Sequence, residues 1–240
     1  KQKNVAMIFE VVNDRGLGLK PYEILKGKLL GELPNEQKEQ ANAIWVELQN
    51  KYYAAEIKNS TESKIDLDMF FQTYFRAKFA NSENDYEKFE SDYHYEIYRD
   101  PQIREYFKNF EDQNHLYKII TEDIKYFADL YFRLRTGYEN EYLIYNKLLD
   151  QNQQYLLIMS AVTYQDDNLE NKINRVAQKF DQFHTVIRLM DIYESQKFQR
   201  LIYPLIKEVR GGTVDDIDSA FNEKLLDTLV EEGAVQKDEV

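Results

Sequence analysis

Cysteine is absent from this sequence, and glycine and proline are scarce. Without cysteine the chain can form neither disulfide bonds nor zinc sites built on thiolates, which suits a reducing cytoplasm. Only 8 Gly and 4 Pro occur among 240 residues. Because these residue types end helices and build the tight turns of all-β proteins, their scarcity favours long helices.

Long apolar runs and excess positive charge are missing as well. No segment approaches the roughly 18 apolar residues that span a membrane, and no signal peptide is visible. The 43 acidic residues outnumber the 31 Lys and Arg residues, which gives a net charge of −12. Because DNA affinity comes largely from Lys and Arg that neutralise phosphates, this charge opposes loose binding to DNA. We expect a soluble, cytoplasmic chain that does not contact a membrane.

Aromatic residues, in contrast, are abundant, with 19 Tyr and 14 Phe. Burying one ring stabilises a fold by on the order of 2 kcal/mol. We therefore interpret these rings as core and helix-packing residues rather than as a binding surface. With 43% hydrophobic and 31% charged residues, the composition is that of a folded globular protein of one large or two small domains.

Apolar residues recur every three or four positions along most of the chain, which is the spacing of one helix face. The clearest stripe lies in residues 173–190, whereas residues 155–164 are uniformly apolar and are predicted to form the most buried helix. A Tyr-rich acidic helix is expected over about 85–98. The next helix starts at Asp100 and Pro101, which are the residue types of a cap and a first helical position.

No strand-like alternation and no fixed repeat are visible. The predicted fold class is therefore all-α: an irregular multi-helix bundle preceded by a small N-terminal helix-turn-helix unit. We predict two domains, 1–33 and 34–240, with a further candidate boundary near 137–140. Because the chain opens at Lys1 on residues typical of a helix interior, we expect a piece of a larger protein without a complete active site.

The sequence offers no recognisable catalytic or metal-binding motif. His94, His115 and His184 lie far apart and outside any HExxH arrangement, so they are interpreted as surface or helix-packing residues and no metal site is predicted. There is neither a phosphate-cradling GxxxxGK nor a GxSxG elbow. The sequence Gly211-Gly212 after Arg210 is interpreted as a helix stop.

Two kinds of charged cluster have a structural interpretation as well. The pairs Asp166-Asp167 and Asp215-Asp216 stand at predicted helix starts, where carboxylates complement exposed N–H groups, so capping is favoured over metal binding. Two basic sets could line a helix face, and we interpret them as solvated surface. They comprise Lys125, Arg133 and Arg135, and Lys197, Arg200, Lys207 and Arg210.

One N-terminal segment could carry chemistry, the turn at residues 13–16. The Asn13 amide can donate and accept hydrogen bonds, and the Arg15 guanidinium can hold a phosphate or a carboxylate through two parallel bonds. A structural role, in which Asn13 holds the turn and Arg15 pairs with a neighbouring acid, explains the same residues equally well.

This segment resembles the F-E-x-x-N-x-R-G-x-x-L signature, followed by (E/D)-(I/L)-L-K, of the GmrSD-type family of modification-dependent restriction proteins. The resemblance covers about the first thirty residues. Gly18 and Lys20 depart from the usual pattern, and the loss of the Ser or Thr cap at Lys20 costs roughly 1 kcal/mol. The matching residues are Phe9, Glu10, Asn13, Arg15, Gly16, Leu19, Glu23, Leu25 and Lys26.

The resemblance implies that residues 1–33 are the end of an N-terminal ParB/sulfiredoxin-like NTPase domain. The helical region would then link that domain to an HNH-type nuclease, within an anti-phage defence endonuclease that uses an NTP and a divalent metal. Asn13 and Arg15 would lie near the nucleotide pocket, with Arg15 meeting phosphate. A DGQQR-type motif and an HNH histidine motif are absent from this chain, so we expect it to bind no cofactor, to be inactive alone, and to reach DNA only through the parent protein.

A second hypothesis belongs to a different class of protein. The chain would be a helical interaction module without enzymatic activity, whose acidic faces rich in Tyr and Phe bind a protein partner. A homo-oligomer also stays open. The two hypotheses differ in what lies next to this sequence in its gene, because only the first requires NTPase and nuclease motifs there.

Overall fold

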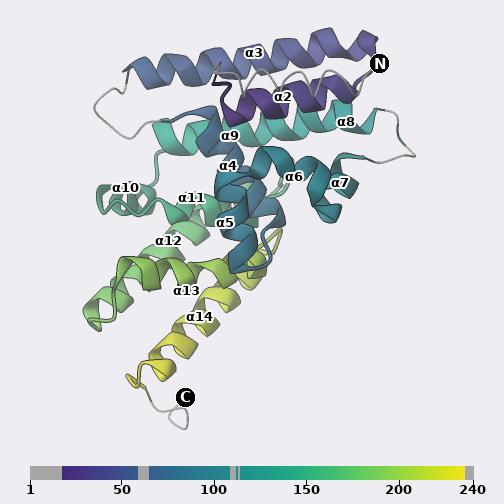
Figure 1. Cartoon of the computed structure of the whole chain (residues 1–240). Helices are drawn as coiled ribbons and strands as arrows, with labels where there is room; N and C mark the ends of the chain where they lie inside the picture. The colour runs from purple at the N-terminus through teal and green to yellow at the C-terminus, as the bar shows by residue number, and fades with distance from the viewer. Residues whose placement is uncertain (1–17, 59–64, 109–111, 113, 236–240) are drawn as a thin grey trace. The chain divides into compact units, whose positions relative to one another are not determined.

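The computed structural model describes residues 18–58, 65–108, 112 and 114–235. These residues form helices and no strand, which confirms the predicted all-α, multi-helix bundle (Figure 1). The helices are α2 (Pro21–Glu32), α3 (Asn35–Lys58), α4 (Leu67–Phe79), α5 (Glu83–Ser91), α6 (Tyr93–Arg99), α7 (Pro101–Phe107), α8 (His115–Lys118), the π-helix η1 (Ile119–Ile124), α9 (Lys125–Thr136), α10 (Glu141–Leu148), α11 (Gln153–Ala161), α12 (Leu169–Leu189), α13 (Ser195–Glu208) and α14 (Val214–Glu231).

The chain forms two compact units. Among the described residues, those up to 75 and those between 88 and 132 form the first unit, and those between 76 and 87 and from 133 onward form the second. The chain therefore passes from one unit to the other inside helices α4, α5 and α9. Helices α2 and α3, which the predicted boundary at residue 33 would separate, belong to the same unit.

The first unit is built around aromatic rings. Helix α2 lies beside α3 (Figure 1). Helix α2 also contacts α6, and α3 contacts η1. Trp45 of α3 stacks on Phe71 of α4 with ring centroids 5.4 Å apart, and Phe75 lies 5.5 Å from Tyr93 of α6. These rings are fully buried, which confirms the interpretation of the aromatic residues as core.

The second unit has its most apolar helix at its centre. Helix α11 packs against both α12 and α13, and all its residues from Gln154 to Ala161 are buried. This confirms the prediction of a buried helix for residues 155–161, whereas Thr163 and Tyr164 lie beyond the helix and are exposed. Gly211 ends the segment after α13 as predicted, since its φ of 62° is a left-handed conformation that glycine adopts without strain. Its N–H donates to the Ser160 carbonyl over 2.9 Å.

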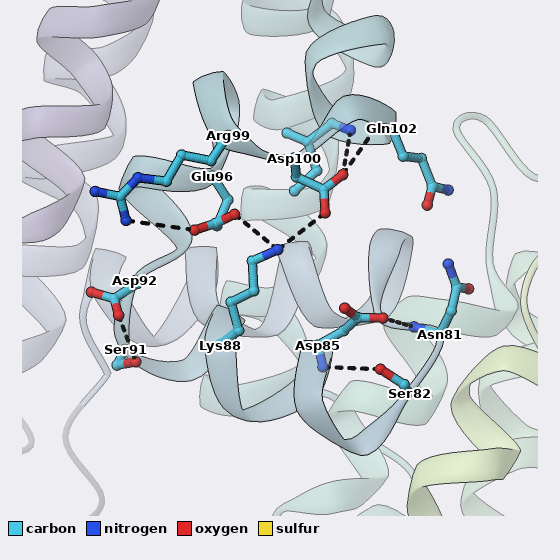
Figure 2. A network of polar contacts seen from close by, with 11 residues as sticks. Asn81, Ser82, Asp85, Lys88, Ser91, Asp92, Glu96, Arg99, Asp100 and Gln102 are labelled. Atoms are coloured by element: carbon cyan, nitrogen blue, oxygen red, sulfur yellow. Dashed lines mark hydrogen bonds and ion pairs between the residues drawn. The ribbon is translucent and has the colours of Figure 1, made fainter.

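The single helix expected over 85–98 is wrong, because the chain breaks at Asp92 into α5 and α6. Aspartate competes with its own backbone for hydrogen bonds and favours helix ends. A salt bridge then ties the two helices together: Lys88 Nζ lies 2.9 Å from Glu96 and 3.1 Å from Asp100 (Figure 2). Burial opposes the charge on Lys88, but the hydrogen bonds to these two carboxylates outweigh it and raise its pKa.

The predicted helix start at Asp100 and Pro101 is confirmed. The Asp100 carboxylate accepts the backbone N–H groups of Gln102 at 2.9 Å and of Ile103 at 3.2 Å, while Pro101 is the first residue of α7. Because the same carboxylate also contacts Lys88, it joins α7 to α5 (Figure 2). This arrangement is the N-terminal cap that the residue types indicate.

Candidate functional site

Some of the residues that match the family signature lie within the described part of the chain, and the others lie outside it. Asn13 and Arg15, together with Phe9, Glu10 and Gly16, lie outside the described residues, so their nucleotide-binding role stays a prediction. The rest of the matching segment comprises Leu19, Glu23, Leu25 and Lys26, which are described. They lie just before or within the first half of α2, so the site can be built from this helix start.

The first turn of α2 has its N–H groups occupied by carboxylates. Glu23 accepts the N–H of Lys20 at 2.8 Å, which is one half of a capping box. Asp68 of α4 accepts the N–H of Tyr22 at 2.8 Å. A Ser or Thr at position 20 would satisfy an N–H of this turn, so Asp68 supplies from another helix the cap that Lys20 cannot provide.

Asp68 holds three helices together. Besides the N–H of Tyr22 in α2, its Oδ1 accepts the hydroxyl of Tyr93 in α6 at 2.5 Å. Burial raises the pKa of the Asp68 carboxyl despite these two donors. Burial, followed by the charge of Asp68, likewise raises the pKa of the Tyr93 phenol, which therefore stays protonated as a donor.

The segment continues into the core and to a neighbouring helix. Leu25 is fully buried, and Lys26 donates to the Gln49 side chain of α3 at 3.3 Å. Gln49 in turn donates to the Tyr22 hydroxyl at 3.4 Å. Burial lowers the pKa of Lys26 against the opposing charge of Glu23. The described residues of the matching segment therefore cap and anchor α2.

A shallow hollow lies next to this helix start. It encloses a volume of about 40 Å³, which is well below that of a typical small-molecule site. An ammonium group, phenols, an amide and a carboxylate face it, so it can accept a small polar group but not, by itself, a whole nucleotide. Its lining residues are Lys20, Tyr22, Gln49, Tyr52, Tyr53, Asp66 and Leu67.

Replacing Asp68 by alanine is expected to lower the free energy of unfolding by about 2 kcal/mol, because one cap and one buried hydroxyl contact are lost. Asp68→Asn is the matched control. Its amide oxygen can accept the same two hydrogen bonds without the buried charge, so less than half of the loss is expected. Urea unfolding of both variants measures the difference, and equal losses would contradict the capping role.

The three histidines are helix-packing residues, as the sequence indicates. His184 is fully buried against the rings of Tyr193 and Phe198. The Nε2 atom of His115 lies 2.7 Å from the carbonyl of Tyr106. His94 is buried in α6, and in the described part of the chain no three His, Asp or Glu side chains come together as metal ligands would.

The burial of His94 makes the stability of the fold depend on pH. Burial, reinforced by the charge of Lys28, lowers the pKa of His94 from 6.5 to about 4. Between these values the unfolded chain binds a proton that the folded chain does not, so stability falls as the pH falls from about 6.5 to about 4.

We expect wild type to lose on the order of 1 to 2 kcal/mol more than His94→Gln between pH 7 and pH 4, allowing for partial solvation of the ring. Urea unfolding at several pH values measures this difference. His184 titrates in both proteins and so cancels in the comparison. Parallel pH curves for the two proteins would contradict the assignment.

Helix capping is confirmed for Asp216 at the start of α14, whereas Asp166 accepts N–H groups in the turn before α12, whose cap residue Asn168 makes no side-chain cap hydrogen bond. Thr213 and Asp216 form a capping box at α14, in which Asp216 accepts the Thr213 N–H at 2.7 Å. Asp166 accepts the N–H of Asn168, the residue before α12, at 2.9 Å. Asp166 is also the buried partner of Lys172, which the sequence did not indicate.

Most of the two basic sets form ordinary helix surface, as interpreted. For Arg210 the interpretation as solvated surface is wrong, because its guanidinium donates hydrogen bonds to the carbonyls at the end of α4. Five of the other cations contact acidic or amide side chains: Lys125 with Glu47, Arg133 with Glu170, Arg135 with Asn152, Lys197 with Glu232, and Arg200 with Glu83. These cations are therefore already engaged and do not form a prepared phosphate-binding stripe.

A cluster that sequence reasoning missed surrounds Asp123 in the π-helix η1. Its Oδ2 accepts the hydroxyl of Tyr74 at 2.5 Å and that of Tyr106 at 3.1 Å. Burial, followed by the charge of Asp123, raises the pKa of both phenols, so they remain protonated donors. The three residues are far apart in sequence, and no spacing pattern connects them.

Comparisons with known proteins add no relative: no family model, curated protein or solved structure matches the chain. Within the described ranges, no helix has both the length and the apolar character that crossing a bilayer requires. The start of α2 with its adjoining hollow therefore remains the site best supported by both sequence and geometry.

Proposed function

We propose that this chain is the helical region of a GmrSD-type, NTP-dependent DNA restriction protein, where it links the NTPase module to the nuclease module. The observation that carries the proposal is the signature from Phe9 to Lys26. Two residues of this signature that the structure describes have structural roles: Glu23 accepts a hydrogen bond at the start of α2, and Leu25 is buried in the core. These roles support the proposal. Within the proposal, Arg15 meets the phosphates of an NTP held with a divalent metal.

Nucleotide binding by the intact gene product tests this proposal. Calorimetric titration with Mg-ATP and Mg-GTP should detect binding of one of them, and Arg15→Ala should weaken it at least tenfold, or by about 1.4 kcal/mol. Arg133→Ala is the matched control, because Arg133 lies on the surface beside Glu170. Unchanged affinity in Arg15→Ala would leave that residue only a structural role.

The same proposal makes two further predictions. The gene should encode a DGQQR-type motif before this sequence and an HNH-type histidine motif after it. The chain alone should hydrolyse neither ATP nor GTP and should cut no DNA. Hydrolysis of ATP or GTP, or cleavage of DNA, by the chain alone would contradict the assignment of these activities to the neighbouring NTPase and nuclease modules.

The second candidate function is a helical interaction module without enzymatic activity. The observation in its favour is a group of exposed large apolar side chains in the second unit, among them Leu148 and Leu189. Such a module would bind neither Mg-ATP nor Mg-GTP. The same calorimetric titration therefore separates the two candidates.

A further inference from the structure

The imidazole of His184 in α12 is buried without a hydrogen-bond partner. The side chain is fully buried, and neither Nδ1 nor Nε2 forms a hydrogen bond with any residue that the structure describes. Buried polar groups are usually paired, because an unpaired one loses the hydrogen bonds that it made with water. A protonated imidazole would bring two donors and a full charge into the same place, so the ring is held here in its neutral form.

Two aromatic rings that follow α12 enclose this imidazole. The ring of Tyr193, in the connection between α12 and α13, lies edge-on to it with centroids 5.2 Å apart, and Phe198 of α13 lies at 5.3 Å. The Tyr193 hydroxyl accepts a hydrogen bond from the Gln151 amide at 3.2 Å. Tyr193 is partly exposed whereas the other two rings are buried, so it is the outermost of the three.

The charges around His184 oppose its protonation. Among the described residues, Arg188, one turn later on α12, is the only charged group that acts on the imidazole, and it does so as a like charge. Asp181, one turn earlier, does not offset it, and burial alone raises the pKa of that carboxyl. The elements beside this part of α12 contribute uncharged groups, namely Phe198 of α13 and Gln151 before α11. Burial, followed by the charge of Arg188, therefore lowers the pKa of His184 below its usual value.

The connection between α12 and α13, residues 190–194, contains a strained residue. Asp191 has a φ of 58°, a left-handed conformation that is unfavourable for residues other than glycine. The next residue, Ile192, donates its N–H to the Ile187 carbonyl at 3.1 Å. Glu194, the residue before α13, makes no side-chain cap hydrogen bond. Opening of this connection therefore relieves strain at Asp191 and sacrifices no side-chain cap of α13.

We propose that His184 is a proton-sensitive switch of the second unit: when its imidazole binds a proton, Tyr193 leaves the ring and the connection between α12 and α13 opens. In the closed form the charged imidazole would have no acceptor, whereas in the open form water supplies one. The open form therefore binds the proton more tightly, and falling pH favours opening. The inference does not depend on nucleotide or DNA binding.

The direction and size of the pH dependence follow from the two forms of His184. In the open form the imidazole is in water and its pKa is near the usual value of about 6.5, whereas in the closed form its pKa is lower. Between the two values the open form binds one proton more than the closed form. The ratio of open to closed molecules should therefore rise by up to about tenfold for each pH unit of acidification below about 6.5.

Amide hydrogen exchange of the chain, followed by NMR, tests the proposal between about pH 7.5 and about pH 5.5. The reporter is the Ile192 N–H, which donates to the Ile187 carbonyl and is released when the connection opens. After correction for the intrinsic effect of pH on exchange, its protection should be at least about fivefold weaker at the lower pH. Dilute urea should leave this protection unchanged, because a local opening exposes little surface.

Three variants show which group is responsible. His184→Phe keeps a buried ring that cannot bind a proton, so the protection of the Ile192 N–H should no longer depend on pH in this range. Tyr193→Phe removes the hydroxyl bonded to Gln151 but keeps the ring beside the imidazole, so it should weaken protection at both pH values and retain the pH dependence. His94→Gln is the matched control, because His94 is a buried histidine of the first unit and its replacement should leave the response unchanged.

Three results would overturn the proposal. Equal protection of the Ile192 N–H at both pH values in the wild-type chain would show that no switch operates. A pH dependence that persists in His184→Phe would assign the response to another group. The third result concerns urea and uses the Val162 N–H, which donates to the Ile158 carbonyl at the end of α11, as the reference for unfolding of the whole unit. If urea weakened the protection of both amides equally, the connection would open only when the unit unfolds.

Discussion

Asp166→Ala is expected to lower the free energy of unfolding by about 3 kcal/mol, because it removes the carboxylate partner of the buried Lys172 ammonium and leaves it only the Ala161 carbonyl, 3.2 Å away, as an acceptor. The Asp166 and Lys172 side chains are only 6% and 8% exposed, and their charged atoms are 2.7 Å apart. Asp166 also accepts the N–H of Thr163 at 3.0 Å. Its removal therefore affects both the ion pair and the turn that leads into α12.

The pKa of Asp166 gives the pH range of this contribution. Burial alone would raise that pKa, but Lys172 and the backbone donors outweigh burial and hold it below its usual value. A depressed carboxyl pKa stabilises the fold at neutral pH, and this stabilisation is lost as the pH falls below about 4.

The double variant Asp166→Ala/Lys172→Met is the control for this prediction. It removes the stranded charge together with its partner, so it should recover more than half of the loss. Urea unfolding at pH 7 and at pH 3 measures all three proteins. A double variant as unstable as Asp166→Ala would contradict the explanation by an unpaired buried charge.

Most helix positions could be predicted from the sequence because their determinants are local. Pro21 and Glu23 are suited to a first helical turn, and α2 begins there. The same holds for Asp100 and Pro101 at α7. The apolar stretch around residue 158 indicated the most buried helix without any knowledge of its neighbours. The break at Asp92 was missed because aspartate also occurs inside helices.

The polar contacts that join helices could not be predicted, because their partners are distant in sequence. Asp68 caps a turn that begins 46 residues earlier, at Tyr22. Without the fold, nothing distinguishes it from the other acidic residues of the chain. At the candidate site, the roles of Glu23 and Leu25 follow from helix periodicity and capping, whereas those of Asn13 and Arg15 rest on the resemblance and stay predictions.

Arg210→Ala is expected to lower the free energy of unfolding by about 3 kcal/mol, since one charged side chain makes several hydrogen bonds to the end of α4. Its Nε donates to the Ala77 carbonyl at 2.8 Å, and its Nη1 donates to Asn81 Oδ1 at 2.8 Å. Its Nη2 donates to the Ala80 carbonyl. The last turn of a helix leaves carbonyl groups without backbone partners, and a cation placed there is also attracted to the negative end of the helix dipole.

Arg210→Lys distinguishes this role from that of a surface charge. A lysine keeps the charge but lacks the planar fork that reaches several acceptors, so it should recover less than half of the loss. Lys207→Ala, three residues earlier on an exposed position of α13, should change the free energy of unfolding by less than about 0.5 kcal/mol. Urea unfolding measures all three variants. If Arg210→Ala resembled Lys207→Ala, the solvated-surface interpretation would hold for Arg210 after all, and the contacts to α4 would contribute nothing to stability.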